Sequence, residues 1–429
     1  MTRLDRERGR TRVTRLDRER RLVVSGGSCL PWTYHAVWIA GLALLVVGLV
    51  MVFSVSTAAG FFREDGDGLV YVRQQGAAAV VGLALLVLFA RIDYRRFRRL
   101  AVPAAFGVAL LLVAVHVPGL GRGAKGATRW LALGPLSLQP SEFAKLAVLV
   151  ASAHLLALRH RLPVTFKALF GPVALVTGPV CVLILLQKDL GTALVVALVI
   201  LGLFWVAGMR PAHWLATAAA GAALAVVAIV SESYRLERFL AFLDPFSDPR
   251  DKGFQIVQAL LALGSGGLFG AGPGRSVQKF SYLPEAHTDM IFAVLGEELG
   301  LVGVAVVVGL FGILTISALH LARRCVDPYG RFLAAGCAFL IGGQAIVNMG
   351  GVSAALPLTG VPLPFISFGR NSLLVSLMAL GIVLSVARFG PVAVPAAESV
   401  SEKVEPENVA YLDRGRRHSR ARGARVGYR

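Results

Sequence analysis

The chain has 429 residues, of which 56% are hydrophobic and only 16% are charged, and its mean hydropathy is +0.68. This composition excludes an ordinary soluble domain and indicates a polytopic membrane protein. The formal net charge of +19 would suit a nucleic-acid binder. However, the basic residues gather in two tails and in short loops beside apolar runs, where membrane topology and anionic lipid account for them. We therefore expect contact with membrane lipid and no nucleic-acid partner.

Apolar runs long enough to cross a bilayer core, which takes about 20 helical residues, recur along the chain. The sequence predicts an all-α, multi-pass membrane fold with ten helices, at 34–57, 73–91, 100–118, 141–158, 170–187, 190–208, 212–231, 289–321, 332–352 and 366–387. Residues 1–33 and 391–429 would form basic tails on either side of a membrane domain at 34–390. The pattern from Met290 to Leu321 exceeds one untilted span, so part of it should tilt, kink or project.

The placement of arginine and lysine predicts the orientation, because basic residues beside membrane-spanning ends are retained in the cytoplasm. They fall in both tails and in every second connection between the apolar runs. With ten crossings, both termini would be cytoplasmic and the loops at 58–72, 118–140, 232–288 and 353–365 would face outward. The largest of these is 232–288, in which residues 254–263 are expected to form a short amphipathic helix lying in the interface.

The cysteines and most histidines carry no pattern of their own. The four cysteines lack paired spacing and two of them lie within predicted spans, so neither a disulfide nor a thiolate metal site is expected. The histidines are scattered without the spacing of metal ligands, and only His287 lies among acids.

An acidic stretch at the start of the eighth span is the most informative feature. An ionisable group at bilayer depth costs roughly 2.5 kcal/mol or more unless it is paired or faces a wet cavity, so carboxylates entering a span are functional candidates. Asp289 directly precedes the apolar run. Glu285 would lie on the same face if the helix begins early, where it would orient Asp289 or raise its pKa. For Glu297 and Glu298 we favour a structural role, as partners of cations on neighbouring helices.

The outer loop at 118–140 is rich in glycine, which predicts a tight hairpin that ends at the fourth span. Ser141 is expected to cap that helix. Glu142 and Lys145, at positions i and i+3, would lie on one face and neutralise each other. That pair either makes burial tolerable or contacts substrate directly, and both alternatives stay open. Arg129 is placed to contact a polar headgroup.

Three further segments carry polar signals. The turn 187–192 is expected to place Asp189 as the cap of the sixth helix. The glycine-rich stretch 264–274 either lets backbone amides approach an anion or is a flexible connector. The last outer loop, 356–369, is rigid, proline-rich and apolar, and Arg370 and Asn371 open the tenth helix.

These blocks together resemble the SEDS family (shape, elongation, division and sporulation) of membrane glycosyltransferases, which includes FtsW, RodA and SpoVE. The resemblance covers nearly all of 34–390 and is carried by Gly-Ala-Thr-Arg-Trp130, Gln-Pro-Ser-Glu-Phe-Ala-Lys145, Asp-Leu-Gly-Thr192, Phe-Leu-Asp-Pro245 with Gly253-Phe-Gln, Leu-Pro-Glu-Ala-His-Thr-Asp289, Gly-Glu-Glu-Leu-Gly300 and Pro-Leu-Thr-Gly-Val-Pro-Leu-Pro-Phe365. Ala286 and Ser276–Lys279 resemble the division and sporulation branch. Two positions depart from the pattern: Lys188 stands where proline is usual, and Arg370-Asn371 where glycine and serine are usual.

The resemblance implies an inverting polymerase of lipid II, the undecaprenyl-pyrophosphate-linked disaccharide-pentapeptide, in the bacterial cytoplasmic membrane with its active site facing outward. It also implies a class B penicillin-binding protein and other divisome membrane proteins as partners. In this interpretation Asp289 is the general base. The predicted substrate-binding residues, which supply cations for the pyrophosphate and polar contacts around the base, are Arg129, Glu142, Lys145, Arg238, Lys279, Glu285 and His287.

Other functions fit the same composition. A lipid II flippase would use ten helices and intramembrane charges equally well, although the polar residues are biased to the outer side. A non-catalytic divisome scaffold would not need the acidic outer loop. No ligand spacing requires a cofactor, and a divalent cation (Mg²⁺ or Mn²⁺) bridging Asp289 and the pyrophosphate stays an open alternative. The sequence leaves open whether the host uses the chain in division, elongation or sporulation.

Overall fold

The computed structural model describes residues 22–25, 31–60, 68–124, 127–133, 136–159, 165–280 and 283–395. The chain divides into two compact units, one formed by Gly27–Pro391 and the other by the two ends, Met1–Gly26 and Val392–Arg429. In the second unit β1 (Leu22–Ser25) pairs antiparallel with β5 (Val392–Pro395). The sequence analysis assigned both segments to basic tails and did not foresee this pairing of two valine-containing segments.

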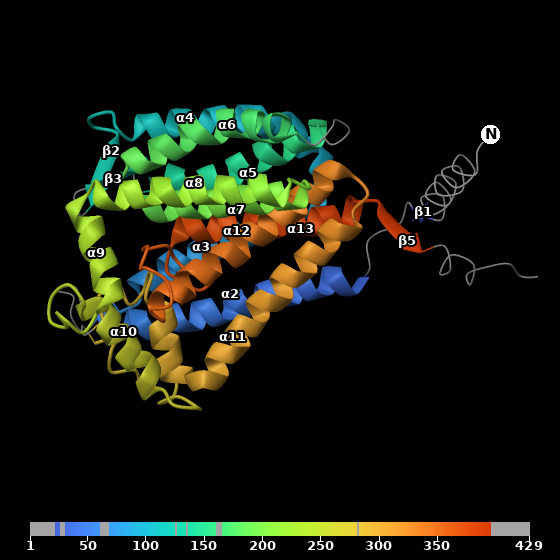
Figure 1. The fold of residues 1–429 in the computed structure, drawn as a ribbon. Coiled ribbons are helices and arrows are strands. Elements are labelled where there is room, and N and C mark those ends of the chain that lie inside the picture. Colours follow the sequence, from blue (N-terminus) through green and yellow to red (C-terminus); the bar gives the residue numbers. More distant parts are fainter. Residues whose placement is uncertain are drawn as a thin grey trace, which may run out of the picture. The chain divides into compact units, whose positions relative to one another are not determined.

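The larger unit is a bundle of long helices (Figure 1). These are α2 (Pro31–Gly60), α3 (Val70–Arg91), α4 (Phe97–Ala114), α5 (Pro140–Arg159), α6 (Phe166–Leu186), α7 (Leu190–Val206), α8 (Pro211–Val230), α11 (Ile291–Arg324), α12 (Pro328–Val352) and α13 (Arg370–Phe389), with the short 3₁₀ turn η1 (Tyr94–Arg96) before α4. Each predicted apolar run corresponds to one of them, which confirms the all-α, multi-pass class. Within the described residues nine helices are long and apolar enough to cross a membrane, and α7, with 17 residues, is shorter. The number of crossings and the side on which each terminus lies stay predictions.

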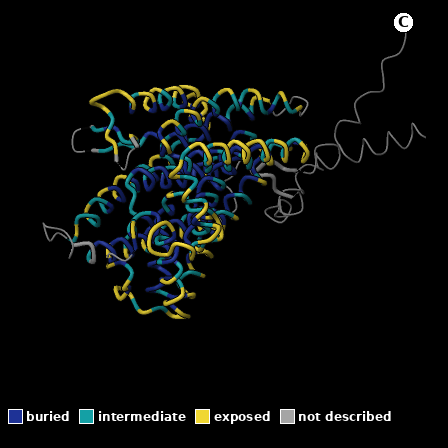
Figure 2. The backbone as a smooth tube through the Cα atoms, turned by 60° about the vertical axis from the view of Figure 1, so that its left-hand side comes forward, coloured by how far each residue is buried: buried dark blue, intermediate teal, exposed yellow. Residues whose placement is uncertain are grey.

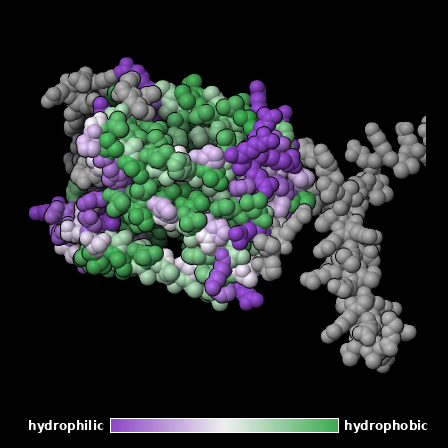
Figure 3. All heavy atoms as spheres, turned by 90° about the horizontal axis from the view of Figure 1, so that it is seen from above, coloured by the Kyte–Doolittle hydropathy of each residue, from purple (hydrophilic) through white to green (hydrophobic). Residues whose placement is uncertain are grey.

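The bundle has a buried centre and an apolar exterior. Helices α5, α12 and α13 bury most of their residues, whereas α8 buries none of its own, and Figure 2 shows dark-blue segments surrounded by yellow ones. The exposed side chains of α8 include Leu215, Leu224 and Val227. Viewed from above, hydrophobic residues cover the middle of the larger unit and hydrophilic ones gather toward two opposite ends (Figure 3). A helix that is apolar all round and exposed is suited to lipid, so this surface fits a bilayer core between two polar ends.

The glycine-rich loop before α5 forms the predicted hairpin. Strands β2 (Gly121–Ala124), β3 (Ala127–Leu133) and β4 (Leu136–Leu138) make an antiparallel sheet in the order β2-β3-β4, with a register shift between Arg122 and Gly123. Two contacts join β4 to the start of α13. The Arg370 guanidinium donates to Ser137 Oγ at 2.7 Å, and Asn371 Nδ2 donates to the Ser137 carbonyl at 3.2 Å. Arg370 and Asn371, which replace the usual glycine and serine, therefore fasten the hairpin to the bundle.

The long segment before α11 contains two short helices, α9 (Ser233–Leu243) and α10 (Phe254–Ser265), which lie at one end of the bundle in Figure 1. The second of these confirms the helix predicted at 254–263, while its place in the membrane interface stays a prediction. The predicted irregularity in α11 is a break at Gly300, where φ is 65° and ψ is −167°.

The glycine-rich stretch after α10 runs along this break and supplies hydrogen bonds that the helix lacks. Ala271 N donates to the Glu297 carbonyl at 2.9 Å, and Leu301 N donates to the Gly267 carbonyl at 2.9 Å. Gly270, with φ of +81°, lies so close that a Cβ atom there would collide with the Glu298 carbonyl oxygen. The stretch is thus an ordered support for α11 and not a flexible connector, while the approach of its amides to an anion stays a prediction.

We predict that Gly270→Ala destabilises the protein, because the new Cβ meets backbone and the left-handed conformation costs about 1–2 kcal/mol outside glycine. Thermal unfolding of the purified protein in detergent should show a midpoint several degrees below that of the wild type. Gly264→Ala is the matched control, since a Cβ there has nothing within 4 Å. Equal midpoints for the two variants would contradict the close approach of the two segments.

Candidate active site

Asp289 lies at the end of a tight turn that precedes α11. Thr288 N and Met290 N donate to the Glu285 carbonyl at 3.0 and 3.3 Å, and Glu285 itself has a φ of 57°. The helix begins only at Ile291, so the expectation that Glu285 and Asp289 share a helical face is wrong. The turn nevertheless brings both carboxylates to one hydroxyl. Thr288 Oγ1 lies 2.8 Å from Glu285 Oε2 and 3.2 Å from Asp289 Oδ1.

The Asp289 side chain is buried, with 6% of the residue exposed. Burial and, to a smaller extent, the neighbouring Glu285 carboxylate raise its pKa, Arg238 and hydrogen bonds lower it, and the net result is a pKa of about 6. The direction expected for Glu285 agrees with this balance, although the contact is made through a turn. A carboxylate with a pKa near 6 is suited to accept a proton at neutral pH.

Arg238 comes to this carboxylate from α9, where its guanidinium also lies 4.7 Å from the centre of the Tyr234 ring. Gly360, in the last loop, lies beside both groups and has a φ of +70°. A Cβ atom on Gly360 would lie 3.6 Å from Asp289 Oδ2 and 3.9 Å from an Arg238 guanidinium nitrogen. The absence of a side chain at residue 360 thus leaves room beside an acid and a cation.

The backbone of Asp289 is fixed from α12. Asn348, which is 3% exposed, donates through Nδ2 to the carbonyl of Asp289 at 2.8 Å and to the carbonyl of Val361 at 2.8 Å. One side chain therefore joins the turn that carries Asp289 to the loop that carries Gly360. Asn348 was not among the residues predicted from the sequence, although a polar residue within an apolar span was a signal for it.

His287 anchors the same turn on the opposite side. Its ring stacks on Tyr71 of α3 with a centroid distance of 4.6 Å and lies 5.7 Å from the Phe368 ring. Its carbonyl accepts a hydrogen bond from Phe368 N at 2.9 Å. The structure thus gives this predicted substrate-binding residue a packing role next to the site.

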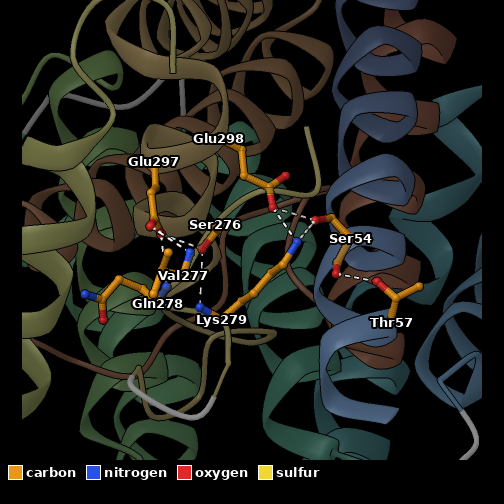
Figure 4. A network of polar contacts seen from close by, with 8 residues as sticks. All are labelled: Ser54, Thr57, Ser276, Val277, Gln278, Lys279, Glu297 and Glu298. Atoms are coloured by element: carbon orange, nitrogen blue, oxygen red, sulfur yellow. Dashed lines mark hydrogen bonds and ion pairs between the residues drawn. The ribbon is translucent and has the colours of Figure 1, made fainter. Parts of the chain in front are cut away.

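Lys279 is placed in a buried network away from solvent (Figure 4). Its ammonium lies 2.8 Å from Glu298 Oε1 and donates to Ser54 Oγ at 2.9 Å, and the side chains of the ion pair are 2% and 1% exposed. The structural role predicted for Glu298 agrees with this arrangement, but the cation comes from the preceding loop and not from a neighbouring helix. Glu297 accepts hydrogen bonds from Ser276 Oγ and from Val277 N.

Lys145 and Glu142 form the ion pair that their spacing predicted. The two side chains lie 2.8 Å apart and are 1% and 4% exposed. Lys145 also donates to Gln344 Oε1 at 2.7 Å, and Gln344 Nε2 donates to the Pro362 carbonyl at 2.8 Å. The pair therefore supports the last loop near Gly360.

Two helix caps were predicted in this region, and Arg129 was expected to contact a polar headgroup. Asp189 caps α7 by accepting from Thr192 N at 3.1 Å, as predicted. Ser141 does not precede its helix, because α5 begins at Pro140, and its hydroxyl instead donates to Asp189 Oδ2 at 3.0 Å. Arg129 donates to the carbonyls of Gln187 and Lys188 at 3.1 and 2.6 Å, so it ties β3 to the α6–α7 turn.

Among the described residues, no group of three or more histidine, cysteine, aspartate or glutamate side chains gathers in a way that could hold a metal ion. The turn brings two carboxylates, Glu285 and Asp289, to the Thr288 hydroxyl, which is fewer than such a group requires.

The fold and the site together define a multi-pass helical membrane protein with a buried carboxylate beside a cation. Residues 34–390 match the model of the cell cycle protein family of FtsW, RodA and SpoVE, and the chain belongs to that family. This finding confirms the resemblance drawn from the sequence.

Similar proteins and structures agree with this assignment. The chain is 42% identical over 345 residues to the "probable peptidoglycan glycosyltransferase FtsW" of Geobacter metallireducens, across 80% of this chain and 92% of that protein. It is 38% identical over 351 residues to the stage V sporulation protein E of Bacillus subtilis, across 81% and 95%. A solved chain from a peptidoglycan synthase complex gives a TM-score of 0.66 at 34% identity, covering 81% and 96%. The rod shape determining protein RodA of Thermus thermophilus gives 0.60 at 33%, covering 82% and 95%.

We predict that Lys279→Met lowers the stability of the protein by about 3–5 kcal/mol, because Glu298 would be left as an unpaired buried charge. The double variant Lys279→Met, Glu298→Gln should recover most of that loss, since neither remaining side chain is charged. Thermal unfolding in detergent measures both effects. A double variant as unstable as the single one would contradict the pairing. A stable double variant that had lost activity would instead indicate that Lys279 binds substrate, as the sequence predicted.

Proposed function

We propose that the chain is a peptidoglycan glycosyltransferase that polymerises lipid II into β-1,4 glycan strands, with Asp289 as the general base. The observation that carries the proposal is the buried Asp289 carboxylate, whose pKa is raised to about 6, beside Arg238 and the open position at Gly360. Relatives named as peptidoglycan glycosyltransferases support the same activity. The reaction would take place on the outer face of the bacterial cytoplasmic membrane.

In the proposed reaction the 4-hydroxyl of the acceptor sugar attacks the anomeric carbon that bears the pyrophosphate. Asp289 takes the hydroxyl proton as the new bond forms, and the α-linked donor is inverted to a β-linkage. Positioned base catalysis contributes about 10²- to 10⁴-fold to such a rate. Asn348 holds the backbone of the base against the last loop, which limits its movement during attack.

The pyrophosphate that leaves needs a cation more than an acid. Of the four cations predicted from the sequence, Arg238 lies beside the base. Lys145 and Lys279 are paired with buried carboxylates, and Arg129 donates to backbone carbonyls. We therefore assign the leaving group to Arg238, with its planar guanidinium suited to phosphate oxygens. A divalent cation (Mg²⁺ or Mn²⁺) that arrives on the phosphate oxygens of the substrate would supply further charge there.

A class B penicillin-binding protein, other divisome membrane proteins and membrane lipid are the partners proposed for the chain. The similar chain from a peptidoglycan synthase complex that coordinates polymerization and crosslinking supports a partner of this kind. The lipid II flippase and the non-catalytic scaffold are the alternatives that the first experiment separates.

We expect Asp289→Asn to lower glycan polymerisation on labelled lipid II by about 10²- to 10⁴-fold, because the amide accepts no proton. Purified protein would be assayed in liposomes with and without a matching transpeptidase. Asp251→Asn is the control, because Asp251 is exposed in the loop between α9 and α10. If the wild type made no polymer with its partner but moved lipid II across the bilayer, the flippase would replace the polymerase. Binding of the partner with neither activity would favour the scaffold.

The pH dependence of polymerisation should report the same carboxylate. Asp289 must be ionised to accept a proton, so kcat/KM should rise with pH and level off above about 6. Arg238→Gln removes a neighbouring positive charge, which raises the pKa of Asp289 and moves this rise to higher pH. Profiles between pH 5 and 9 measure both, with Arg250→Gln in an exposed loop as the control. If the pH profile of Arg238→Gln is the same as that of the wild type, the charge of Arg238 does not act on Asp289.

A further inference from the structure

The hydroxyl of Thr288 is shared by two carboxylates. It lies 2.8 Å from Glu285 Oε2, 3.2 Å from Asp289 Oδ1 and 3.2 Å from the Glu285 carbonyl. A threonine hydroxyl has one proton to donate and two lone pairs with which to accept. When it donates to Glu285, its oxygen is free to accept from Asp289, but only if Asp289 carries a proton.

The same residues differ in how far they are exposed to solvent. Asp289 is 6% exposed, whereas Thr288 and Glu285 are only partly buried. The turn that creates this order is unusual, because Glu285 has a φ of 57°. Residues other than glycine adopt that conformation at a cost, and such strain concentrates at functional sites. The strained backbone directs the Glu285 side chain back to Thr288.

A base inside this site faces a physical problem. Each transfer leaves a proton on Asp289, and polymerisation repeats the transfer many times. The proton must leave Asp289 before the next transfer, and the Thr288 hydroxyl lies within hydrogen-bond distance of that buried carboxyl. The charged groups that act on Asp289 are Glu285 and Arg238, and of the two only the carboxylate of Glu285 can accept a proton.

We infer that Thr288 relays the proton from Asp289 to Glu285, from which water removes it, so that the base is reset after each bond. This inference rests on the proposed function. The polar contacts within one turn of chain, from Asp289 Oδ1 through Thr288 Oγ1 to Glu285 Oε2, form the path.

The steps balance as follows. The acceptor O–H bond breaks and its proton goes to Asp289, while the oxygen bonds to the anomeric carbon and undecaprenyl pyrophosphate leaves as an anion. Protonated Asp289 then gives its proton to Thr288 Oγ1, and the original Thr288 hydroxyl proton passes to Glu285 Oε2. Glu285 loses that proton to water. Asp289 ends as a carboxylate and Thr288 as a neutral hydroxyl.

The test separates the first bond from the bonds that follow, since the relay acts only after a bond has formed. Thr288→Val removes the hydroxyl with little change of shape, Glu285→Gln removes the final acceptor, and Thr288→Ser keeps the hydroxyl. Quenched reactions with enzyme equal to labelled lipid II would measure formation of the product with two disaccharides. Reactions with lipid II in excess would measure steady-state polymerisation. Both would be run at pH 8.5, well above the pKa of the base.

We expect the steady-state rate of Thr288→Val and of Glu285→Gln to fall at least tenfold more than the first-bond rate of the same variant, and Thr288→Ser to keep the wild-type ratio of the two rates. The acid limb of the pH profile should move to higher pH in Thr288→Val and to lower pH in Glu285→Gln. Loss of the hydroxyl removes a hydrogen bond that lowers the pKa of Asp289, and loss of the Glu285 charge removes a repulsion that raises it. A common steady-state defect with opposite shifts cannot come from the pKa of the base alone.

The relay is overturned if Thr288→Val polymerises at the wild-type rate. It is also overturned if its first-bond and steady-state rates fall by the same factor, because Thr288 would then only position Asp289. Glu285→Gln decides the question should Thr288→Val fail to fold, as judged by its thermal unfolding in detergent. Absence of polymer from the wild type with its partner would instead refute the proposed function, so the two failures are distinguishable.

Discussion

A charge inside an apolar helix bundle must have a partner, and the arrangement of the outer segments follows from how this chain meets that demand. Lys145 is neutralised by Glu142 on its own helix and reaches Gln344, which holds the Pro362 carbonyl. Lys279 is neutralised by Glu298 and reaches Ser54 of α2. Each buried pair therefore also connects a loop to the bundle. Pairs of this kind contribute more to a unique arrangement than to net stability, because desolvation offsets much of their attraction.

Asp289 breaks the pattern that the other buried charges follow. It has a like charge in Glu285 beside it, and Arg238 only partly compensates the cost of burial. Its surroundings are held by other polar contacts: Asn348 holds its backbone to Val361, and Lys145 reaches the same loop through Gln344. The unfavourable environment of this carboxylate is thus fixed by hydrogen bonds to the last loop.

The sequence predicted the features that depend on local spacing. Each apolar run became a helix because the bilayer demands continuous helical hydrogen bonding, and the i,i+3 pair of Glu142 and Lys145 formed because a helix fixes that geometry. The partners of Lys279 and Arg129 could not be read in this way, because they depend on how loops return to distant segments. The same holds for Asn348, whose two acceptors come from different loops. The turn at Glu285 was missed because a positive φ at glutamate has no compositional signal.

Gly360 is relevant to the design of inhibitors. The volume that its missing side chain leaves is bordered by the Asp289 carboxylate and the Arg238 guanidinium. A compound that places one small uncharged group there would contact both the carboxylate and the guanidinium, and it would need neither a sugar nor a phosphate to do so. Resistance to such a compound by substitution of Gly360 is constrained, because a side chain there would have to adopt the left-handed backbone and would itself contact the same two groups.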